Sequence, residues 1–258
     1  MPSARLIPLV LSAAVAWPAA AAQSWRTVES ARQLRDSAQH RVHVQYGAGR
    51  IDVGATNAPL LYSMTLRYDE ATTTPIHRYD ADARTLTLGV EDQSSHFRRN
   101  MGENSNGEMR LALSRSVPID LQLELGATKA QLDLGGLSLL GLHLESGASE
   151  TLLDFSTPNQ TRMRALEIDV GAASLEVRNL GNANAASVHV KGGVGSVELD
   201  FAGVSEIGQA FADELFRVFA RAHPEIRITP INTEPAVARM IRRVLSEESA
   251  RQKTEPES

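Results

Sequence analysis

Carboxylates recur at alternate positions through the middle of the chain, between leucine, isoleucine and valine residues. Alternate residues of a β-strand point to the same side, so these acidic residues would share an outward face. Stacked on neighbouring strands, they could form a ladder that binds cations, but we interpret them as a solvated face. They are Glu124, Asp133, Glu145, Asp154, Asp169, Glu176, Glu198 and Asp200.

The seven histidines are scattered and predict no metal site. None forms an H-x-x-x-H pair on an expected helix, and we interpret the neighbours His40 and His43 as polar surface residues. His96 lies with Arg98 and Arg99 in the polar stretch 91–108, which could bind an anion. We expect this stretch to be a solvated, mobile loop.

No motif of catalysis or cofactor binding is present. The chain lacks a G-x-S-x-G elbow, a P-loop, an H-E-x-x-H pair and a dinucleotide fingerprint. The glycine-rich run 192–195 lacks a following Lys-Ser/Thr pair and reads as a corner between two strands. Because the chain also has no cysteine, thiolate metal sites and disulfides are excluded. We expect no enzymatic activity, no cofactor and no bound metal.

A repeat of 21 to 24 residues runs from Ile119 to Phe201, and each unit has a strand, a glycine corner and a second short strand. The corners contain Gly126, Gly147, Gly171 and Gly192, and an earlier copy lies around Gly47. Such a period is typical of stacked coils, in which each rung buries its apolar face against the next. The sequence favours a β-solenoid over an antiparallel sandwich with similarly spaced turns. We expect the side chains of Leu123, Leu144, Val170 and Val190 to stack inward on successive rungs.

This rhythm, with the phrase GGVGSVELDF, resembles the toast-rack and adhesin-like families of exported bacterial β-solenoids over residues 25–203. The resemblance implies a mainly β fold and no catalytic residues. Two further alternating strands are expected at 60–68 and 85–90, before the main run of repeats.

After the repeats, the sequence predicts a different order of elements: a strand, a helix, a second strand and a second helix. We expect a helix over 206–222, capped by Ser205, with Ile207, Phe211, Leu215, Val218 and Phe219 on its apolar side. A strand over 226–231 and a helix from 234 to about 245, capped by Thr233, would follow. The polar residues 247–258 would fray into a disordered tail.

Residues 197–246 resemble the second half of a STAS-like domain, notably in the run Ile207 to Glu214. The resemblance implies an interaction surface at Gly208, Gln209, Asp213 and Glu214. Gln209 and Ala210 occupy the region where related anti-sigma antagonists carry a phosphorylated serine, so we expect no phospho-switch. The segment is either a cap on the open end of the solenoid or a recombined junction, because an uncapped stack would expose strand edges.

The first 22 residues predict a secretory signal peptide, with a basic start, a short apolar run and an A-x-A pattern before Gln23. We therefore expect domains at 1–22 (signal peptide), 23–203 (β-solenoid), 197–246 (STAS-like half-domain or cap) and 247–258 (tail), and a periplasmic or secreted protein. The net charge of −5 argues against nucleic acid as a partner, and no later apolar run predicts a membrane span.

Two functions remain open at this point. The first is an exported, non-enzymatic β-solenoid that binds or scaffolds a protein or another component of the cell envelope. The second is a cytoplasmic STAS-like module for regulatory protein–protein interaction, which would require the chain to lack a functional export signal.

Overall fold

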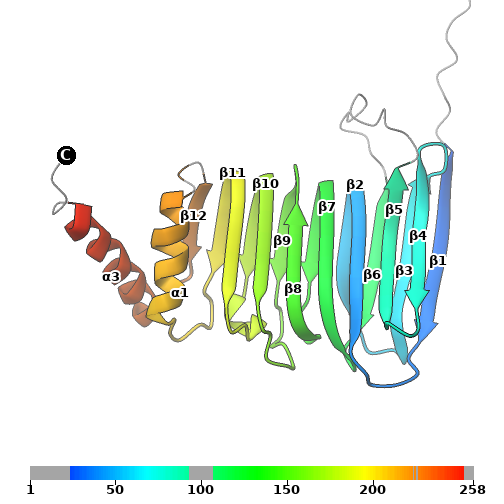
Figure 1. Ribbon diagram of the computed structural model, residues 1–258, viewed down its shortest axis with the longest axis horizontal. Helices are drawn as coiled ribbons and strands as arrows, with labels where there is room; N and C mark the ends of the chain where they lie inside the picture. Colours follow the sequence, from blue (N-terminus) through cyan, green and yellow to red (C-terminus); the bar gives the residue numbers. More distant parts are fainter. Residues whose placement is uncertain (1–23, 93–106, 223, 225, 253–258) are drawn as a thin grey trace, which may run out of the picture.

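One continuous sheet of 12 strands winds into a stack of coils, and helices lie at the C-terminal end of the stack (Figure 1). The computed structural model describes residues 24–92, 107–222, 224 and 226–252. The mainly β solenoid expected from the repeat is confirmed. The signal peptide and the loop residues His96, Arg98 and Arg99 lie outside the described residues, as do residues 253–258.

The elements follow one another along the chain in a fixed order. The strands are β1 (Trp25–Gln33), β2 (His40–Thr56), β3 (Leu60–Asp69), β4 (Thr73–Asp80), β5 (Thr85–Asp92), β6 (Glu108–Ser114), β7 (Pro118–Asp133), β8 (Ser138–Ser146), β9 (Glu150–Asp154), β10 (Leu166–Arg178), β11 (Val188–Asp200) and β12 (Ile226–Ile231). The helical segments are η2 (Leu180–Ala183), α1 (Gln209–Asp213), the π-helical η3 (Glu214–Phe219), α2 (Ala220–Ala222) and α3 (Pro235–Gln252).

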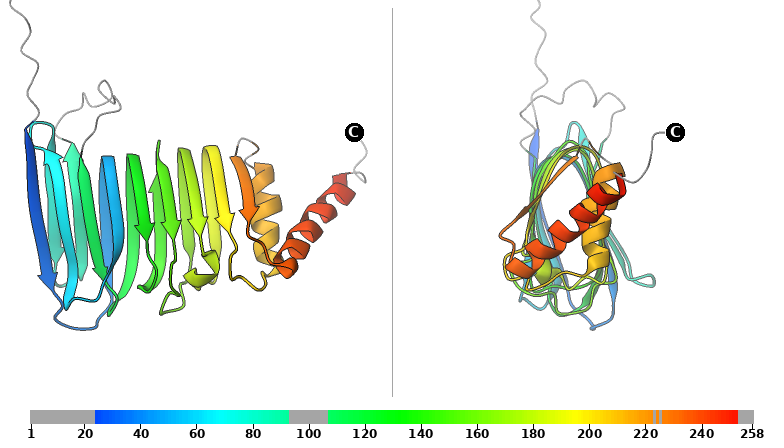
Figure 2. Two further views of the ribbon diagram at one scale, coloured as in Figure 1. Left: turned by 180° about the vertical axis from the view of Figure 1, so that it is seen from behind. Right: turned by 90° about the vertical axis from the view of Figure 1, so that its left-hand side faces the viewer.

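Each rung turns a corner near its middle, either within one long strand or, in the β8–β9 rung, between two strands, so its two halves lie in different walls of a flattened coil (Figure 2). The order β2, β7, β8–β9, β10, β11 is parallel throughout, which excludes the antiparallel sandwich. We call the first halves, with β5, the first wall; in the rungs these are residues 40–46, 118–125, 138–146, 166–170 and 188–192. The second wall holds the remaining halves, β6 and β12.

Apolar side chains from both walls fill the inside of the coil in register. On the first wall Leu123 pairs with Leu144, Leu144 with Ile168, and Ile168 with Val190, and all four are buried. The expected place of Val170 in this row is therefore wrong. Val170 is also buried, but it pairs with Gly192 one step further along the strands. Ile168 and Val170 point to the same side of β10 because they are two positions apart in the strand.

A glycine stands at the corner because the backbones of successive rungs approach closely there. A Cβ atom on Gly126 would lie 2.1 Å from the carbonyl oxygen of Gly47 on the preceding rung. Any larger residue would force the two rungs apart. The corresponding distances are 3.2 Å at Gly147 and 3.1 Å at Gly171, whereas a Cβ atom on Gly192 would meet the side chain of Ile226, so little space for a side chain remains at each of these corners.

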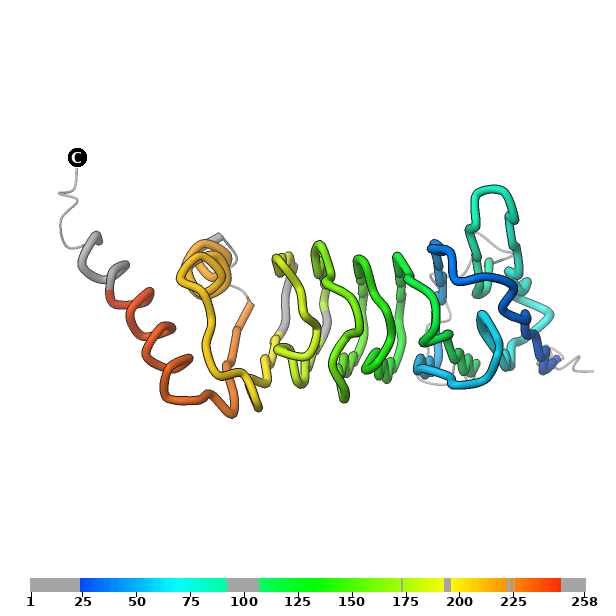
Figure 3. Tube along the Cα trace, turned by 90° about the horizontal axis from the view of Figure 1, so that it is seen from below, coloured from blue at the N-terminus to red at the C-terminus, as the bar shows by residue number. Residues whose placement is uncertain are grey.

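The N-terminal end of the sheet departs from the parallel pattern. Strands β1, β3 and β6 pair antiparallel and continue the second wall, while the β4–β5 hairpin joins the first wall through the pairing of β5 with β2. Figure 3 shows this hairpin as a turquoise loop that projects from the outline of the stack. The expected strands at 60–68 and 85–90 are confirmed as β3 and β5, whereas β1, β4 and β6 were not anticipated.

At the C-terminal end one continuous helix, formed by α1, η3 and α2, follows β11 in the chain and lies beside β12, beyond the last rung (Figure 1). The expected cap at Ser205 is wrong: the helix begins at Gln209, and Gly208 is its N-cap. The π-helical turn shifts the buried side, so Phe216 is buried and packs 6.3 Å from the ring of Phe201, whereas Val218 is 37% exposed.

Helix α3 packs against α1 and η3 through the buried residues Val237, Ile241 and Val244. It starts at Pro235 and continues to Gln252, beyond the end expected near Leu245, so part of the expected tail is helical. The backbone N–H of Ala238 donates to the carbonyl of Glu234, which makes Glu234 the capping residue in place of Thr233.

Candidate functional site

Two neighbouring rows of polar side chains run along the outside of the first wall, perpendicular to its strands. Register places the members of each row directly opposite one another. The upstream row is Thr87, His43, Gln122, His143, Glu167 and His189, and the downstream row is Gln45, Glu124, Glu145, Asp169 and Lys191.

The eight carboxylates singled out in the sequence do not form one ladder. Glu124, Glu145 and Asp169 are consecutive in the downstream row of the first wall. The other five belong to second-wall strands, where Asp133 is opposite Asp154 and Glu176 is opposite Glu198. The alternation of each strand predicted which residues face outward, but it did not show that the corner divides them between two walls.

A first polar group surrounds Glu124 and is fully satisfied by protein partners. Gln45 donates to one carboxylate oxygen at 2.9 Å, while His43 and Gln122 contact the other at 2.8 and 3.0 Å. The hydrogen bond from Gln45, followed by that from His43, lowers the pKa of Glu124 below its ordinary value. This carboxylate is held ionised by fixed donors.

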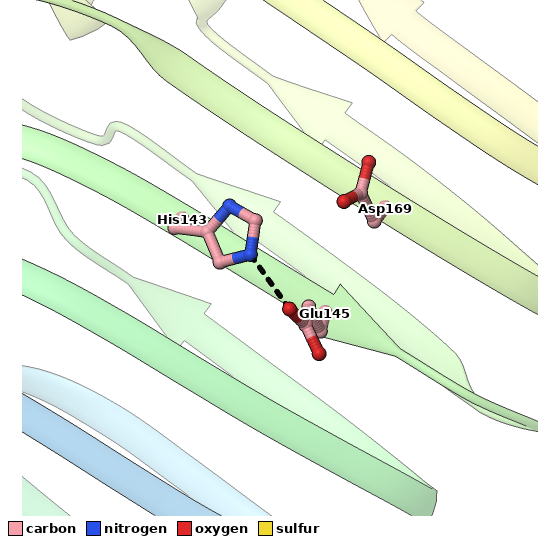
Figure 4. Close-up of side chains that lie close together, drawn as sticks. All are labelled: His143, Glu145 and Asp169. Carbon is pink, nitrogen blue, oxygen red and sulfur yellow. Dashed lines mark hydrogen bonds and ion pairs between the residues drawn. The ribbon is translucent and has the colours of Figure 1, made fainter.

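A second polar group lies two rungs from His43, on β8 and β10 (Figure 4). The Nε2 atom of His143 is 2.9 Å from Glu145, and its Nδ1 atom is 3.3 Å from Glu167. Asp169 lies directly opposite Glu145, and its carboxylate completes a set of donor atoms within 4.8 Å of one another. The hydrogen bond to Glu145, with the charges of Glu145, Asp169 and Glu167, raises the pKa of His143 above its ordinary value.

A groove of about 1020 Å³ runs over the corners at the downstream edge of this wall. Its floor includes the corner glycines from Gly47 to Gly192, and the acidic row borders it. Ile76, Arg78 and Glu91 of the β4–β5 hairpin line it at the N-terminal end, and Lys191 lines it at the C-terminal end. The groove therefore spans several rungs and has cationic side chains at both ends and carboxylates between them.

The interaction residues implied by the STAS-like resemblance lie together at the start of the C-terminal helix. Gly208, Gln209 and Glu214 are exposed, whereas Asp213 is half-buried and forms an i,i+4 ion pair with Arg217. The ion pair of Asp213 therefore stabilises the helix to which both residues belong. An interaction surface at these residues stays a prediction.

The interpretation of His40 and His43 as surface residues fails for His40. Its side chain is 5% exposed, its Nδ1 atom is bonded to the carbonyl of Ala38, and its Nε2 atom is 3.2 Å from the hydroxyl of Tyr79. The sequence also gave no warning that His143 would meet three carboxylates, since Glu167 and Asp169 lie on the next rung. An i,i+2 His–Glu pair in a strand is the local signal that could have indicated the group.

Sequence comparison places this stack among known proteins. Residues 21–178, more than half of the chain, match the family described as the N-terminal domain of toast_rack, DUF2154. The chain belongs to the toast-rack family. Residues 195–238, from the end of β11 into α3, match a STAS-like domain of unknown function (DUF4325), so both resemblances found in the sequence are confirmed.

One solved structure shares the fold of this toast-rack protein at low sequence identity, and a second matches it with a TM-score too low to show a common fold. A putative cell adhesion protein from Clostridium sporogenes is 16% identical with a TM-score of 0.57, over 68% of this chain and 99% of that one. A putative adhesin from Bacteroides fragilis is 11% identical with a TM-score of 0.28, over 69% and 89% of the two chains. No curated protein matches the sequence. Within the described residues, no helix has both the length and the apolar character that a membrane crossing requires.

Proposed function

We propose that this toast-rack protein is exported and acts without catalysis as a binding or scaffolding module at the bacterial cell envelope. The observation that carries the proposal is the groove along the first wall, which a rigid stack of rungs holds open over about 1020 Å³. Its partner would be a protein or another envelope component with an extended, charged surface.

Three features support a binding role for this wall. The in-register strands fix the outward side chains in straight rows, so a partner meets a surface that needs little ordering. The groove carries carboxylates between Arg78 and Lys191, a charge pattern that favours one register of a partner. The β4–β5 hairpin lines one end of the groove and adds to the surface that a partner would contact.

Export is tested by fractionating cells that produce the natural chain. We expect mature protein in the periplasm, envelope or medium, and N-terminal sequencing should begin at Gln23. Full-length protein found in the cytoplasm alone would contradict export and would favour the regulatory STAS-like alternative.

Binding is tested separately by sedimenting the purified mature protein with isolated cell envelopes. The double variant Arg78→Glu/Glu124→Lys reverses charges of the groove and should reduce the sedimented fraction. Glu198→Lys, which changes an exposed residue of the second wall, is the matched control and should sediment like the natural protein. Equal loss with both variants, or no sedimentation of the natural protein, would contradict a binding role for the groove.

A further inference from the structure

We propose that His143, Glu145 and Asp169 bind a divalent transition-metal ion such as Zn²⁺ on the first wall, with Glu167 as the group that orients the histidine. The donor atoms of the three ligands lie within 4.8 Å of one another. Ligands at about 2.0–2.2 Å from one ion are separated by roughly 3–4 Å. Small side-chain rotations therefore suffice to close the site.

The backbone already holds the three side chains in converging positions. His143 and Glu145 are two residues apart on β8 and point outward together, and Asp169 lies opposite Glu145 on β10 (Figure 4). Strands β8 and β10 each pair with a neighbouring strand on both sides within the stack. Ligands carried by such rigid strands lose little freedom when an ion binds.

The charge balance of the group calls for a cation. Glu145, Glu167 and Asp169 surround a single imidazole, and like charges placed directly opposite on neighbouring strands, as Glu145 and Asp169 are, destabilise a sheet. Among the described residues, Lys191, at 4.0 Å from Asp169, is the one lysine or arginine paired with these carboxylates. Glu124 differs, because amide groups and His43 satisfy it. A divalent ion would supply the missing positive charge.

The two nitrogens of His143 already have separate surroundings. The Nδ1 atom is buried, makes no hydrogen bond and lies 3.3 Å from the Glu167 carboxylate. A carboxylate on one imidazole nitrogen is the usual partner of a histidine that ligates metal through the other nitrogen. Nε2 is the nitrogen that faces Glu145. On binding, Glu145 would exchange its hydrogen bond with Nε2 for a bond to the ion.

The ligand types indicate which ions would bind. One imidazole and two carboxylates suit Zn²⁺, Co²⁺ or Mn²⁺, whereas Ca²⁺ and Mg²⁺ prefer oxygen ligands alone. Three protein ligands leave an open coordination position for water or for a donor from a partner. Because Glu145 and Asp169 also line the groove, an ion held there would be accessible from it.

The test uses the untagged mature protein, freed of metal with a chelator, and titrates it with Zn²⁺ by calorimetry and with Co²⁺ by visible absorption. About one ion per chain should bind, and Co²⁺ should give the absorption bands of a nitrogen–oxygen site. His143→Ala and Asp169→Asn should weaken Zn²⁺ binding by more than about 100-fold. Glu167→Gln should weaken it by about 10- to 100-fold, as expected for an orienting partner.

His189→Ala is the control, since this exposed histidine lies in the same row on β11, one rung beyond Glu167 and Asp169. It should bind Zn²⁺ as the natural protein does. The melting temperature of each apo variant shows that the fold is intact. The proposal is overturned if no Zn²⁺ binds at submillimolar concentration, if His143→Ala binds as well as His189→Ala, if both histidine variants lose binding equally, or if Ca²⁺ binds as tightly as Zn²⁺.

Discussion

At the scale of single residues, the direction of each side chain decides its role. Ile168 and Glu167 are neighbours in the chain, but Ile168 is 1% exposed inside the coil and Glu167 belongs to the outer histidine–carboxylate group. Strand alternation predicted such directions correctly from the sequence. It could not predict which rungs pair in which register, because that depends on the lengths of the turns, and so Val170 was expected where Ile168 stands.

Ile168→Ala should lower the free energy of unfolding by about 2 to 5 kcal/mol, because it leaves a cavity in the inward row. Urea denaturation followed by circular dichroism measures the change. The exposed His189, on the neighbouring strand, provides the comparison, and His189→Ala should change stability by less than about 0.5 kcal/mol. An equal loss of unfolding free energy in the two variants would show that burial of the inward row does not stabilise the fold.

The carboxyl group of Glu124 should titrate below the ordinary value for glutamate, because Gln45 and then His43 stabilise its charged form. Its contribution to stability is therefore present above the ordinary pKa and is lost as the pH falls through the lowered one. Carbon-13 NMR of the side chain measures the midpoint. Gln45→Ala should raise it, and Gln131→Ala, a change at an exposed glutamine of the second wall, should not.

At the scale of elements, the bounds of the strands that the sequence predicts are closer to the structure than the bounds of the helices, although β1, β4 and β6 were not anticipated. The expected strand over 226–231 is β12 to the residue, since its alternation of isoleucine with polar residues ends at the polar pair Asn232 and Thr233. The preceding helix begins later than predicted, after its N-cap Gly208, and the π-helical turn changes which of its side chains are buried. Neither feature leaves a periodic pattern in the sequence. Phe216 thus replaces Val218 on the buried side. The outer group of four side chains escaped prediction because it joins two strands that lie about one rung apart in the chain.

Phe216→Ala should cost about 3 to 5 kcal/mol of unfolding free energy, because its ring is 6% exposed and packs against Phe201. Val218→Ala, at a position 37% exposed on the same helical turn, should cost much less. Denaturation curves of the two variants measure the difference. If Val218→Ala were the more harmful change, the helix would pack by the face that its plain α-helical spacing predicts.

At the scale of the whole molecule, the C-terminal helices and β12 cover the last rung. We infer that the STAS-like segment serves as a cap, because β12 pairs with the edge of β11 and the helix covers Phe201. The sequence raised this possibility from the need to protect an open stack, but it could not show how the two segments join.

A chain that ends at Gly203 should aggregate or melt at a lower temperature, since it exposes the edge of β11 and the ring of Phe201. Size-exclusion chromatography with light scattering detects the aggregation. A chain that ends at Ser246 keeps Val244 and the packed turns of α3, and it should remain monodisperse if the full chain is. A stable, soluble chain ending at Gly203 would contradict the cap.

The in-register pairing of the rungs also fixes the length of the stack in whole strand spacings. Each rung advances the stack by one strand spacing, about 4.8 Å, while its turns absorb differences in chain length. The rungs from Leu123 to Val190 differ in length, with 21, 24 and 22 residues between equivalent positions, yet each advances the stack by one strand. Removing one complete rung would therefore bring the β4–β5 hairpin and the C-terminal helices about 4.8 Å closer without altering either end. Evolution could set the span of such a protein in whole steps, independently of what it carries at its ends.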